Sequence, residues 1–332
     1  MKSGIAAAGN WIIDRVKVVD IYPEQDALAN ILSETSGNGG APYNLLKDLA
    51  KVGYEGGLQA IGLVGNDTDG NRIVADCREN GIDTYLLAQT DRASTSYTDV
   101  MTVVGTGRRT FFHHRGANAL LRAEHFDFDR ISARHLHLGY LLLLDGLDEL
   151  DETHGTAAAR VLAMAKQNGL TTSIDVVSED SDRFGRIVLP SVRHADIVFM
   201  NEFELARTTG ISFGAKDDAR LMHAGEVLAA GIAGVLVVHT PDRVFAFLSN
   251  GRRIEHGAVR MPEDLIRGAV GAGDAFAAGF LAGFVRGERT EDSLRYGVCV
   301  AAASLLASDS SSGVMPWMGC LELGSRYGYY DQ

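Results

Sequence analysis

The segment Gly271-Ala272-Gly273-Asp274 combines backbone amides and an acid in a way that suits phosphoryl chemistry. An apolar stretch follows it, so we expect it to open a buried helix. The first N–H groups of a helix have no intrahelical partner, and glycines leave them uncovered, which makes such a start an anion site. Asp274 stands in the first turn, where the helix dipole favours its charged form. Amides that hold a phosphoryl group beside a carboxylate that accepts a hydroxyl proton are the parts that phosphoryl transfer needs.

An aspartate that only caps a helix is the alternative interpretation of Asp274. The apolar character of the following helix argues against it. Burying a carboxylate at the start of such a helix costs free energy unless something polar lies there.

A second group of polar residues lies near the N-terminus. Pro42 suits the first position of a helix, and Gly39 and Gly40 before it allow unusual backbone angles. Asn44 falls in the first turn, where its amide offers a donor and an acceptor to a hydroxylated ligand. Asp14 interrupts an otherwise apolar run. Ordinary helix entry for the glycines, and an edge-strand position facing water for Asp14, are the alternatives.

Short apolar runs alternate with helical patterns along most of the chain. We expect buried strands at 5–8, 59–64, 135–138, 170–175, 197–200 and 235–239, and helices at 42–52, 68–80, 153–168, 217–230, 272–286 and 291–306. Strands separated by helices of this length are typical of βαβ units. The sequence therefore predicts an α/β fold with a central, mostly parallel β-sheet flanked by helices on both faces.

Two regions, at about 11–36 and 94–115, break this alternation with strand-like patterns and no helix between them. We expect them to form a small β-sheet lid over a cleft, or a dimer surface. No linker, charge block or internal repeat divides the chain. Residues 1–332 are therefore predicted to form a single α/β domain with the β lid inserted in it.

Composition and charge exclude several partners. The chain has 31 Lys and Arg against 43 Asp and Glu, a net charge of −12 with no basic cluster, which argues against nucleic acid. The apolar segment 268–285 holds Asp274 near its middle, where lipid penalises a charge, so we expect no membrane contact. Cys77, Cys299 and Cys320 form no disulfide or zinc pattern, which favours a cytoplasmic protein.

Taken together and in this order, these segments resemble the ribokinase-like sugar kinases, the pfkB family of carbohydrate kinases. The matching segments span nearly the whole chain: Gly9-Asn10-x-x-x-Asp14, Gly39-Gly40-Ala41-x-x-Asn44, Gly62-x-Val64-Gly65-x-Asp67-x-x-Gly70, Arg115-Gly116-Ala117-Asn118, Asn201-x-x-Glu204 and Gly271-Ala272-Gly273-Asp274. The last is the most specific. The resemblance implies a ribokinase-like fold whose β lid often pairs two subunits, so a homodimer through the lid is expected.

The resemblance also implies a function, namely transfer of the γ-phosphoryl group of ATP to a hydroxyl of a small sugar or sugar acid, with ATP and Mg²⁺ as cofactors. Asp274 would be the base, beside an anion hole made by the amides of Gly271, Ala272 and Gly273. Acceptor contacts would come from Asp14, Gly39, Gly40, Asn44 and Asn118. The ATP and Mg²⁺ side would include Asn201, Glu204 and Thr240, with Glu204 acting on the metal indirectly.

Three departures from the family pattern bear on these roles. Gly268-Ala269-Val270 replace polar residues that help to hold a monovalent cation in relatives, which puts activation by K⁺ in doubt. Pro241 alters the turn on the nucleotide side. Asp175 is given no catalytic role. A nucleoside kinase of the same fold, or a non-catalytic regulator that binds sugar or nucleotide, remains an alternative, and the sequence does not identify the acceptor.

Overall fold

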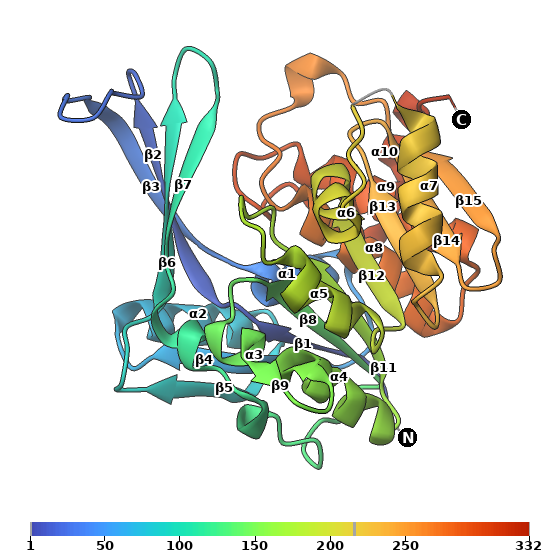
Figure 1. The fold of residues 1–332 in the computed structure, drawn as a ribbon. Helices are drawn as coiled ribbons and strands as arrows, with labels where there is room; N and C mark the ends of the chain where they lie inside the picture. The colour runs from blue at the N-terminus through green and yellow to red at the C-terminus, as the bar shows by residue number, and fades with distance from the viewer. Residues whose placement is uncertain (1, 215–216, 332) are drawn as a thin grey trace.

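A computed structural model describes residues 2–214 and 217–331. Its central sheet has nine strands in the order β15-β14-β13-β12-β11-β8-β1-β4-β5 (Figure 1). The strands are β1 (Ile5–Gly9), β4 (Leu58–Gly65), β5 (Asp83–Thr90), β8 (His135–Leu141), β11 (Thr171–Val176), β12 (Ile197–Asn201), β13 (Val235–His239), β14 (Arg243–Leu248) and β15 (Arg253–Gly257). Neighbours from β13 to β5 are parallel, whereas β14 and β15 pair antiparallel. The expected strands are all confirmed, and β5, β14 and β15 extend the sheet beyond them.

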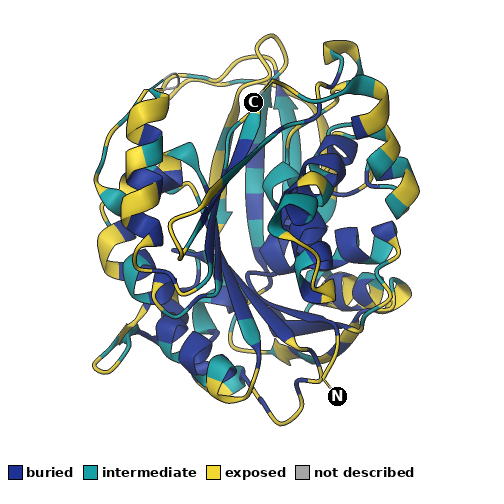
Figure 2. Ribbon diagram, turned by 90° about the vertical axis from the view of Figure 1, so that its right-hand side faces the viewer, coloured by how far each residue is buried: buried dark blue, intermediate teal, exposed yellow. Residues whose placement is uncertain are grey.

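Helices cover both faces of this sheet, because successive strand residues point to opposite sides. In β12, Ile197 and Phe199 pack in one core and Val198 and Met200 in the other. One face carries α1 (Ala41–Val52), α2 (Thr68–Glu79), α8 (Ala272–Arg286), α9 (Thr290–Ser304) and α10 (Trp317–Tyr327), and the other α4 (Ala157–Gln167), α5 (Phe184–Val192), α6 (Glu202–Thr209) and α7 (Asp218–Ala229). Figure 2 shows buried residues on the sheet and exposed ones on the outer sides of the helices. The predicted α/β class is confirmed.

The six expected helices are present, with one shifted start. Helix α4 begins at Ala157 rather than at 153. The preceding residues pair instead in a short ladder of β9 (Leu150–Asp151) with β10 (Gly155–Thr156). The Thr156 hydroxyl then accepts the N–H of Ala159 at 3.1 Å, which caps the helix at that point.

A second sheet stands away from the main body (Figure 1). It has four strands in the order β3-β2-β6-β7, namely β2 (Ile12–Val19), β3 (Ile31–Gly39), β6 (Ser96–Val103) and β7 (Arg109–His114). The outer pairs are antiparallel, and β2 pairs parallel to β6. These strands occupy the two regions in which a lid was expected, with β3 running three residues further, to Gly39.

Helix α8 is the element that carries the Gly-Ala-Gly-Asp segment into the core. It spans 15 residues, and Phe276 and Phe280 pack edge-on against Phe199 of β12. Across residues 2–214 and 217–331, the structure contains no helix with both the length and the apolar character needed to cross a membrane. The apolar run around Asp274 is a helix that is buried against one face of the central sheet.

Candidate active site

The candidate site lies where the carboxyl ends of the parallel strands meet the N-termini of α1 and α8. Ligands of open α/β sheets bind at such an edge. A cavity of about 660 Å³ opens there between the lid, α1, α2 and the loop 308–312. Asp14, Val270 and Ser310 are among the residues that line it. The cavity therefore adjoins both groups of residues that the sequence singled out.

Asp274 is buried in the first turn of α8, with 3% of its surface exposed. The Tyr140 hydroxyl lies 2.7 Å from each of its carboxylate oxygens, and Asn44 Nδ2 donates to Oδ2 at 2.8 Å. Burial raises the pKa of Asp274 to about 6, against the lowering effect of these two hydrogen bonds. A carboxyl group that titrates near neutral pH and is held by fixed donors is suited to accept a proton.

The start of α8 forms the predicted cradle of amides. Gly271 precedes the helix with φ 75°, a left-handed conformation, and a Cβ there would lie 2.6 Å from the Cβ of Ser310. A Cβ on Gly273 would meet only the ring of His239, at 3.6 Å. Burial lowers the pKa of His239 to about 4, so the ring is neutral at pH 7. The helix start therefore presents its N–H groups with little side-chain cover, as an anion site requires.

Residues at the start of α1 reach the same point. Asn44 donates to Asp274 and accepts the hydroxyl of Ser310 at 2.7 Å, so its amide is oriented from both sides. Gly40 precedes α1 with φ 94°, and a Cβ there would lie 1.9 Å from the carbonyl oxygen of Asn10. Only glycine allows this approach of α1 to the end of β1.

Asp14, on lid strand β2, lies beside Gly39 and close enough to Asp274 to sense its charge. A Cβ on Gly39 would lie 2.1 Å from Asp14 Oδ2, so the glycine leaves room for this carboxylate. Burial and the negative charge of Asp274 raise the pKa of Asp14 to about 7. The structure thus brings Asp14, Gly39, Gly40 and Asn44 together around Asp274.

Asn118, a predicted acceptor contact, is hydrogen-bonded to the backbone beside the lid. Its Oδ1 accepts the Trp11 N–H at 3.2 Å, its Nδ2 donates to the Trp11 carbonyl at 3.1 Å, and its own N–H donates to Ser96 Oγ at 3.1 Å. The residue is fully buried. Its amide therefore ties the end of the lid to the start of β2, and a contact with the acceptor stays a prediction.

Asn201 and Glu204 form the N-terminal cap of α6. Asn201 Oδ1 accepts the Glu204 N–H and Glu204 Oε2 accepts the Asn201 N–H, both at 2.9 Å, which is a capping box. Glu204 Oε1 also accepts the hydroxyl of Ser178 at 2.7 Å. The Asn-x-x-Glu element therefore fixes the edge of the sheet beside the site, with its carboxylate oxygens already hydrogen-bonded.

Thr240 lies in the turn between β13 and β14. Its hydroxyl donates to Asp242 Oδ1 at 2.8 Å and accepts the Arg243 N–H at 3.0 Å. These bonds close the turn around Pro241. A nucleotide contact by Thr240 stays a prediction, and its hydroxyl would have to leave this turn to make one.

Asp175, to which the sequence gave no role, lies at the end of β11 and belongs to the same acidic group. Burial and the charges of Asp274 and Glu204 raise its pKa well above the usual range, and burial raises the pKa of Glu204 to about 7. Within the described part of the chain, no three His, Cys, Asp or Glu side chains form a metal cage. Mg²⁺ needs only one or two carboxylates when phosphates supply the other oxygens, so these acids fit an ion that arrives with ATP.

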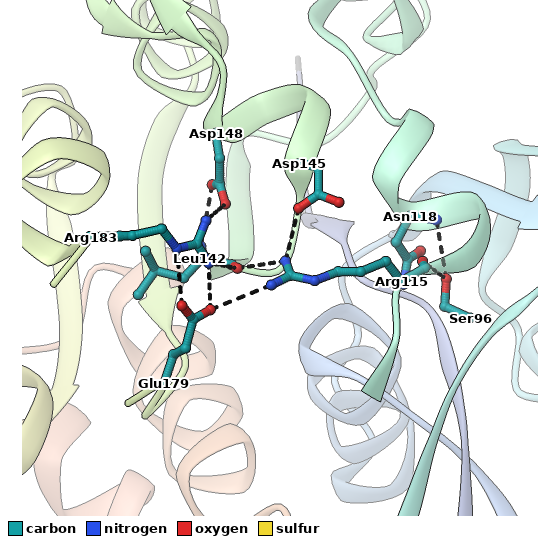
Figure 3. A network of polar contacts seen from close by, with 8 residues as sticks. All are labelled: Ser96, Arg115, Asn118, Leu142, Asp145, Asp148, Glu179 and Arg183. Carbon is teal, nitrogen blue, oxygen red and sulfur yellow. Dashed lines mark hydrogen bonds and ion pairs between the residues drawn. The ribbon is translucent and has the colours of Figure 1, made fainter. Parts of the chain in front are cut away.

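Sequence reasoning missed Tyr140 and the polar network behind it. Leu142, two residues further, has its carbonyl oxygen held by Arg115 Nη1 at 2.6 Å and Arg183 Nη2 at 2.7 Å (Figure 3). Glu179 joins the two guanidinium groups. The available signal was position, because Tyr140 follows directly on an expected buried strand, at the carboxyl edge where ligands bind.

Asp48 of α1 is a buried carboxyl group, and neither of its oxygens has a hydrogen-bond partner among residues 2–214 and 217–331. Burial raises its pKa well above the usual value. A carboxyl group with a higher pKa in the folded state binds more protons when folded, so stability falls as pH rises through the unfolded value of about 4.

We therefore expect Asp48→Asn to be more stable than the wild type, by a margin that widens as the pH rises above about 4. Urea unfolding at several pH values measures this margin. A margin that stays constant or narrows over this range would contradict the assignment of a protonated, buried Asp48.

A family model for the pfkB family carbohydrate kinases matches residues 2–318. The ATP-dependent ribose-1-phosphate kinase of Halopiger xanaduensis is 28% identical over 88% of this chain and 88% of its own length. The 5-dehydro-2-deoxygluconokinase of Shouchella clausii is 24% identical over 84% of this chain and 83% of its own, and fructokinase-1 of Zea mays is 28% identical over 85% and 83%.

Solved structures show the same fold. Ribokinase from Giardia lamblia superposes with a TM-score of 0.81 at 19% identity, covering 96% of this chain and 99% of that one. Ribokinase from Arabidopsis thaliana, complexed with ribose and ATP, superposes with a TM-score of 0.80 at 19% identity, covering 97% of this chain and 99% of that one. The chain belongs to the pfkB family of carbohydrate kinases. It is thus an ATP-dependent sugar kinase, a phosphotransferase whose acceptor is an alcohol group.

Proposed function

We propose that this kinase phosphorylates a small sugar or sugar acid, with Asp274 as the base. The acceptor hydroxyl attacks the γ-phosphorus of ATP, its proton passes to Asp274, and ADP leaves with the bridging oxygen. The observation that supports this most is the buried carboxylate of Asp274, fixed by Asn44 and Tyr140 at the glycine-lined start of α8. The amides of Gly271, Ala272 and Gly273 would stabilise the charge that develops on the transferred group.

The acceptor would bind in the cavity beneath the lid. Asp14, Gly40 and Asn44 would contact its hydroxyls, because Asp14 lines this cavity, Asn44 binds Asp274, and Gly40 begins the helix that carries Asn44. Relatives are named as kinases of a keto-deoxy sugar acid, of ribose 1-phosphate and of fructose. These names span neutral sugars, sugar acids and sugar phosphates, so the acceptor has to be found by experiment.

The ATP side would lie along β12, β13 and the start of α8. Mg²⁺ would arrive on the phosphates of ATP, where it neutralises their charge, and Glu204 would act on it through water because both its oxygens already accept hydrogen bonds. Asn201 would hold Glu204 in this orientation. The loss of polar residues at 268–270 keeps a role for K⁺ in doubt.

ADP release over a panel of acceptors tests the proposed function. The panel contains fructose, ribose, ribose 1-phosphate, 2-keto-3-deoxygluconate, 5-dehydro-2-deoxygluconate and adenosine, each with MgATP and with or without K⁺. We expect one sugar or sugar acid to exceed adenosine clearly in kcat/KM. Preferential turnover of adenosine would instead identify a nucleoside kinase, and calorimetric binding of a sugar without turnover would identify a regulator.

We further propose that two copies pair through their lids. Large apolar side chains gather on the lid with more than half of their surface exposed, among them Leu28 at 83%, Leu32 at 56% and Phe111 at 58%. An exposed apolar surface of this kind usually marks an interaction site.

Sedimentation equilibrium tests the pairing with Leu32→Asp as the variant. We expect a dimer for the wild type and a monomer for Leu32→Asp, because a charge on the lid would be buried without a partner. Met318→Asp, at an exposed apolar position on α10 outside the lid, is the matched control and should remain a dimer. A wild-type monomer at micromolar concentration, or a dimeric Leu32→Asp, would contradict the proposal.

A further inference from the structure

The hydroxyl of Tyr140 is placed differently from any other group around Asp274. It lies 2.7 Å from both carboxylate oxygens, whereas Asn44 reaches only Oδ2. A phenol has a single proton to donate, and burial together with nearby carboxylates raises the pKa of Tyr140 well above its usual value. The phenol therefore remains protonated and acts as a donor to Asp274 across the physiological pH range.

The other ionisable groups that face Asp274 cannot replace this donor. Asp14 from β2, Asp48 from α1, Asp175 from β11 and Glu204 from α6 are carboxyl groups, and each disfavours a further negative charge. The ring of His239 from β13 is neutral and lies against Gly273. Tyr140 and Asn44 are thus the neutral hydrogen-bond donors that stabilise the charged form of Asp274.

The backbone on both sides of Tyr140 is held by buried polar groups. Its own N–H donates to Asn10 Oδ1 at 2.7 Å. Two residues later, Leu142 adopts φ 77°, which is unusual for a residue with a side chain, and its N–H donates to Asp148 Oδ1 at 3.2 Å. The end of β8, which carries Tyr140, is therefore anchored on both sides of that residue.

A pair of arginines completes this anchor from two different parts of the fold. Arg115 follows the last lid strand and Arg183 directly precedes α5, and both donate to the Leu142 carbonyl (Figure 3). Asp145, Asp148 and Glu179 pair with these guanidinium groups, so the clamp is complete without any ligand. We call Arg115, Arg183 and the Leu142 carbonyl the arginine clamp.

We propose that Tyr140 is a positioning residue for phosphoryl transfer, whose hydroxyl keeps Asp274 ionised and oriented, and that the arginine clamp sets the position of this hydroxyl. The proposal rests on the role of Asp274 as base. Asp274 must be ionised to accept the acceptor proton, and its second oxygen, Oδ1, is left with only the Tyr140 contact. An acceptor hydroxyl can therefore approach Oδ1 while Tyr140 and Asn44 hold the carboxylate in place.

The pH dependence of Tyr140→Phe tests the proposal. Loss of a donor to the carboxylate raises the pKa of Asp274, and activity is lost as pH falls through that value, so the acidic limb of kcat/KM should move to higher pH. We expect a shift of about one pH unit, so that kcat/KM falls about twofold at pH 7 and about tenfold at pH 5. Tyr329→Phe is the matched control, because its hydroxyl is partly buried against Cys299, away from the site, and its profile should be unchanged.

Carbon-13 NMR provides a readout that needs no acceptor. Aspartate carboxyl carbons are labelled, and the Asp274 signal is identified by its absence in Asp274→Asn. We expect its titration midpoint to rise in Tyr140→Phe and, by a smaller amount, in Arg183→Lys. The double variant should show no larger shift than Tyr140→Phe alone, because the arginine clamp would act only through the tyrosine.

Three results would overturn the proposal. An unchanged midpoint in Tyr140→Phe, with only the KM of the acceptor raised, would make Tyr140 an acceptor-binding residue. A higher kcat would mean that the hydroxyl obstructs the acceptor. Additive shifts in the double variant would separate the clamp from Tyr140. Failure of the proposed function is distinguishable, because Asp274→Asn would then retain turnover whatever Tyr140→Phe does.

Discussion

Replacing Asp274 by asparagine is expected to lower kcat by about 10³-fold while leaving the fold intact. General-base catalysis contributes roughly 10²- to 10⁴-fold to a rate, and an amide cannot accept the proton of the acceptor hydroxyl. Asparagine has the shape of aspartate, and its carbonyl oxygen can still accept from Asn44 or Tyr140. Because the substitution removes a buried ionisable group, the free energy of unfolding should not fall.

Asp48→Asn is the matched control for this experiment. It makes the same chemical change at another buried carboxyl group, on α1, which faces Asp274 but forms no hydrogen bond with Asp274, Asn44 or Tyr140. ADP release with the best acceptor of the panel should be normal in Asp48→Asn and nearly absent in Asp274→Asn. If Asp274→Asn kept more than a tenth of the wild-type kcat, another group would have to be the base.

Replacing Gly271 by alanine has the second largest expected effect. Its left-handed φ of 75° costs any other residue about 1–2 kcal/mol. In addition, the new Cβ would lie 2.6 Å from the Cβ of Ser310, so the start of α8 and the loop 308–312 must separate. This separation moves the amides of the anion cradle, and the loss of one such donor lowers kcat by about 10²- to 10³-fold.

Gly287→Ala separates these two causes. Gly287 ends the same helix with φ 82°, and its Cβ would meet nothing within 4 Å. Both variants should lose stability through the backbone conformation, measured as the free energy of urea unfolding. Only Gly271→Ala should lose kcat as well. Equal kinetics in the two variants would show that the position of the amide cradle does not matter for transfer.

Local patterns were sufficient to predict the central elements. The strands at 5–8 and 197–200 and the helices at 42–52 and 272–286 carry strong apolar signals of the expected length, and the structure confirms them. Edge elements were not predicted. β5 alternates between buried and exposed residues at the end of the sheet, so it lacks the continuous apolar run of a central parallel strand. β14 has such a run, but it follows β13 after a short turn and pairs antiparallel, which a pattern of strands alternating with helices does not predict.

The residues of the candidate site likewise fall into those that a local sequence pattern predicts and those that it does not. Gly271 and Asp274 were found because a helix start is a local signal. Tyr140 was not, since its hydroxyl meets Asp274 only after β8 and α8, 134 positions apart in sequence, have packed on each other. The structural contacts of Asn118 were not predicted either. Both ends of its amide bind the backbone of Trp11, 107 positions away, which its local motif does not indicate.

The parallel pairing of β2 with β6 governs the order in which the enzyme can assemble during synthesis. Ile12 pairs with Ser96, so the lid cannot close its sheet until the chain has grown past that strand. Asn44 can form its hydrogen bonds with Asp274 and Ser310 only after those two residues, late in the sequence, have been synthesised. Closing such long loops costs conformational entropy before the contacts between their ends can offset that cost. A nascent chain that ends before α8 would therefore expose the part of one apolar sheet face that α8 and α9 cover, and it would be prone to aggregation until roughly the last fifth of the chain had been made.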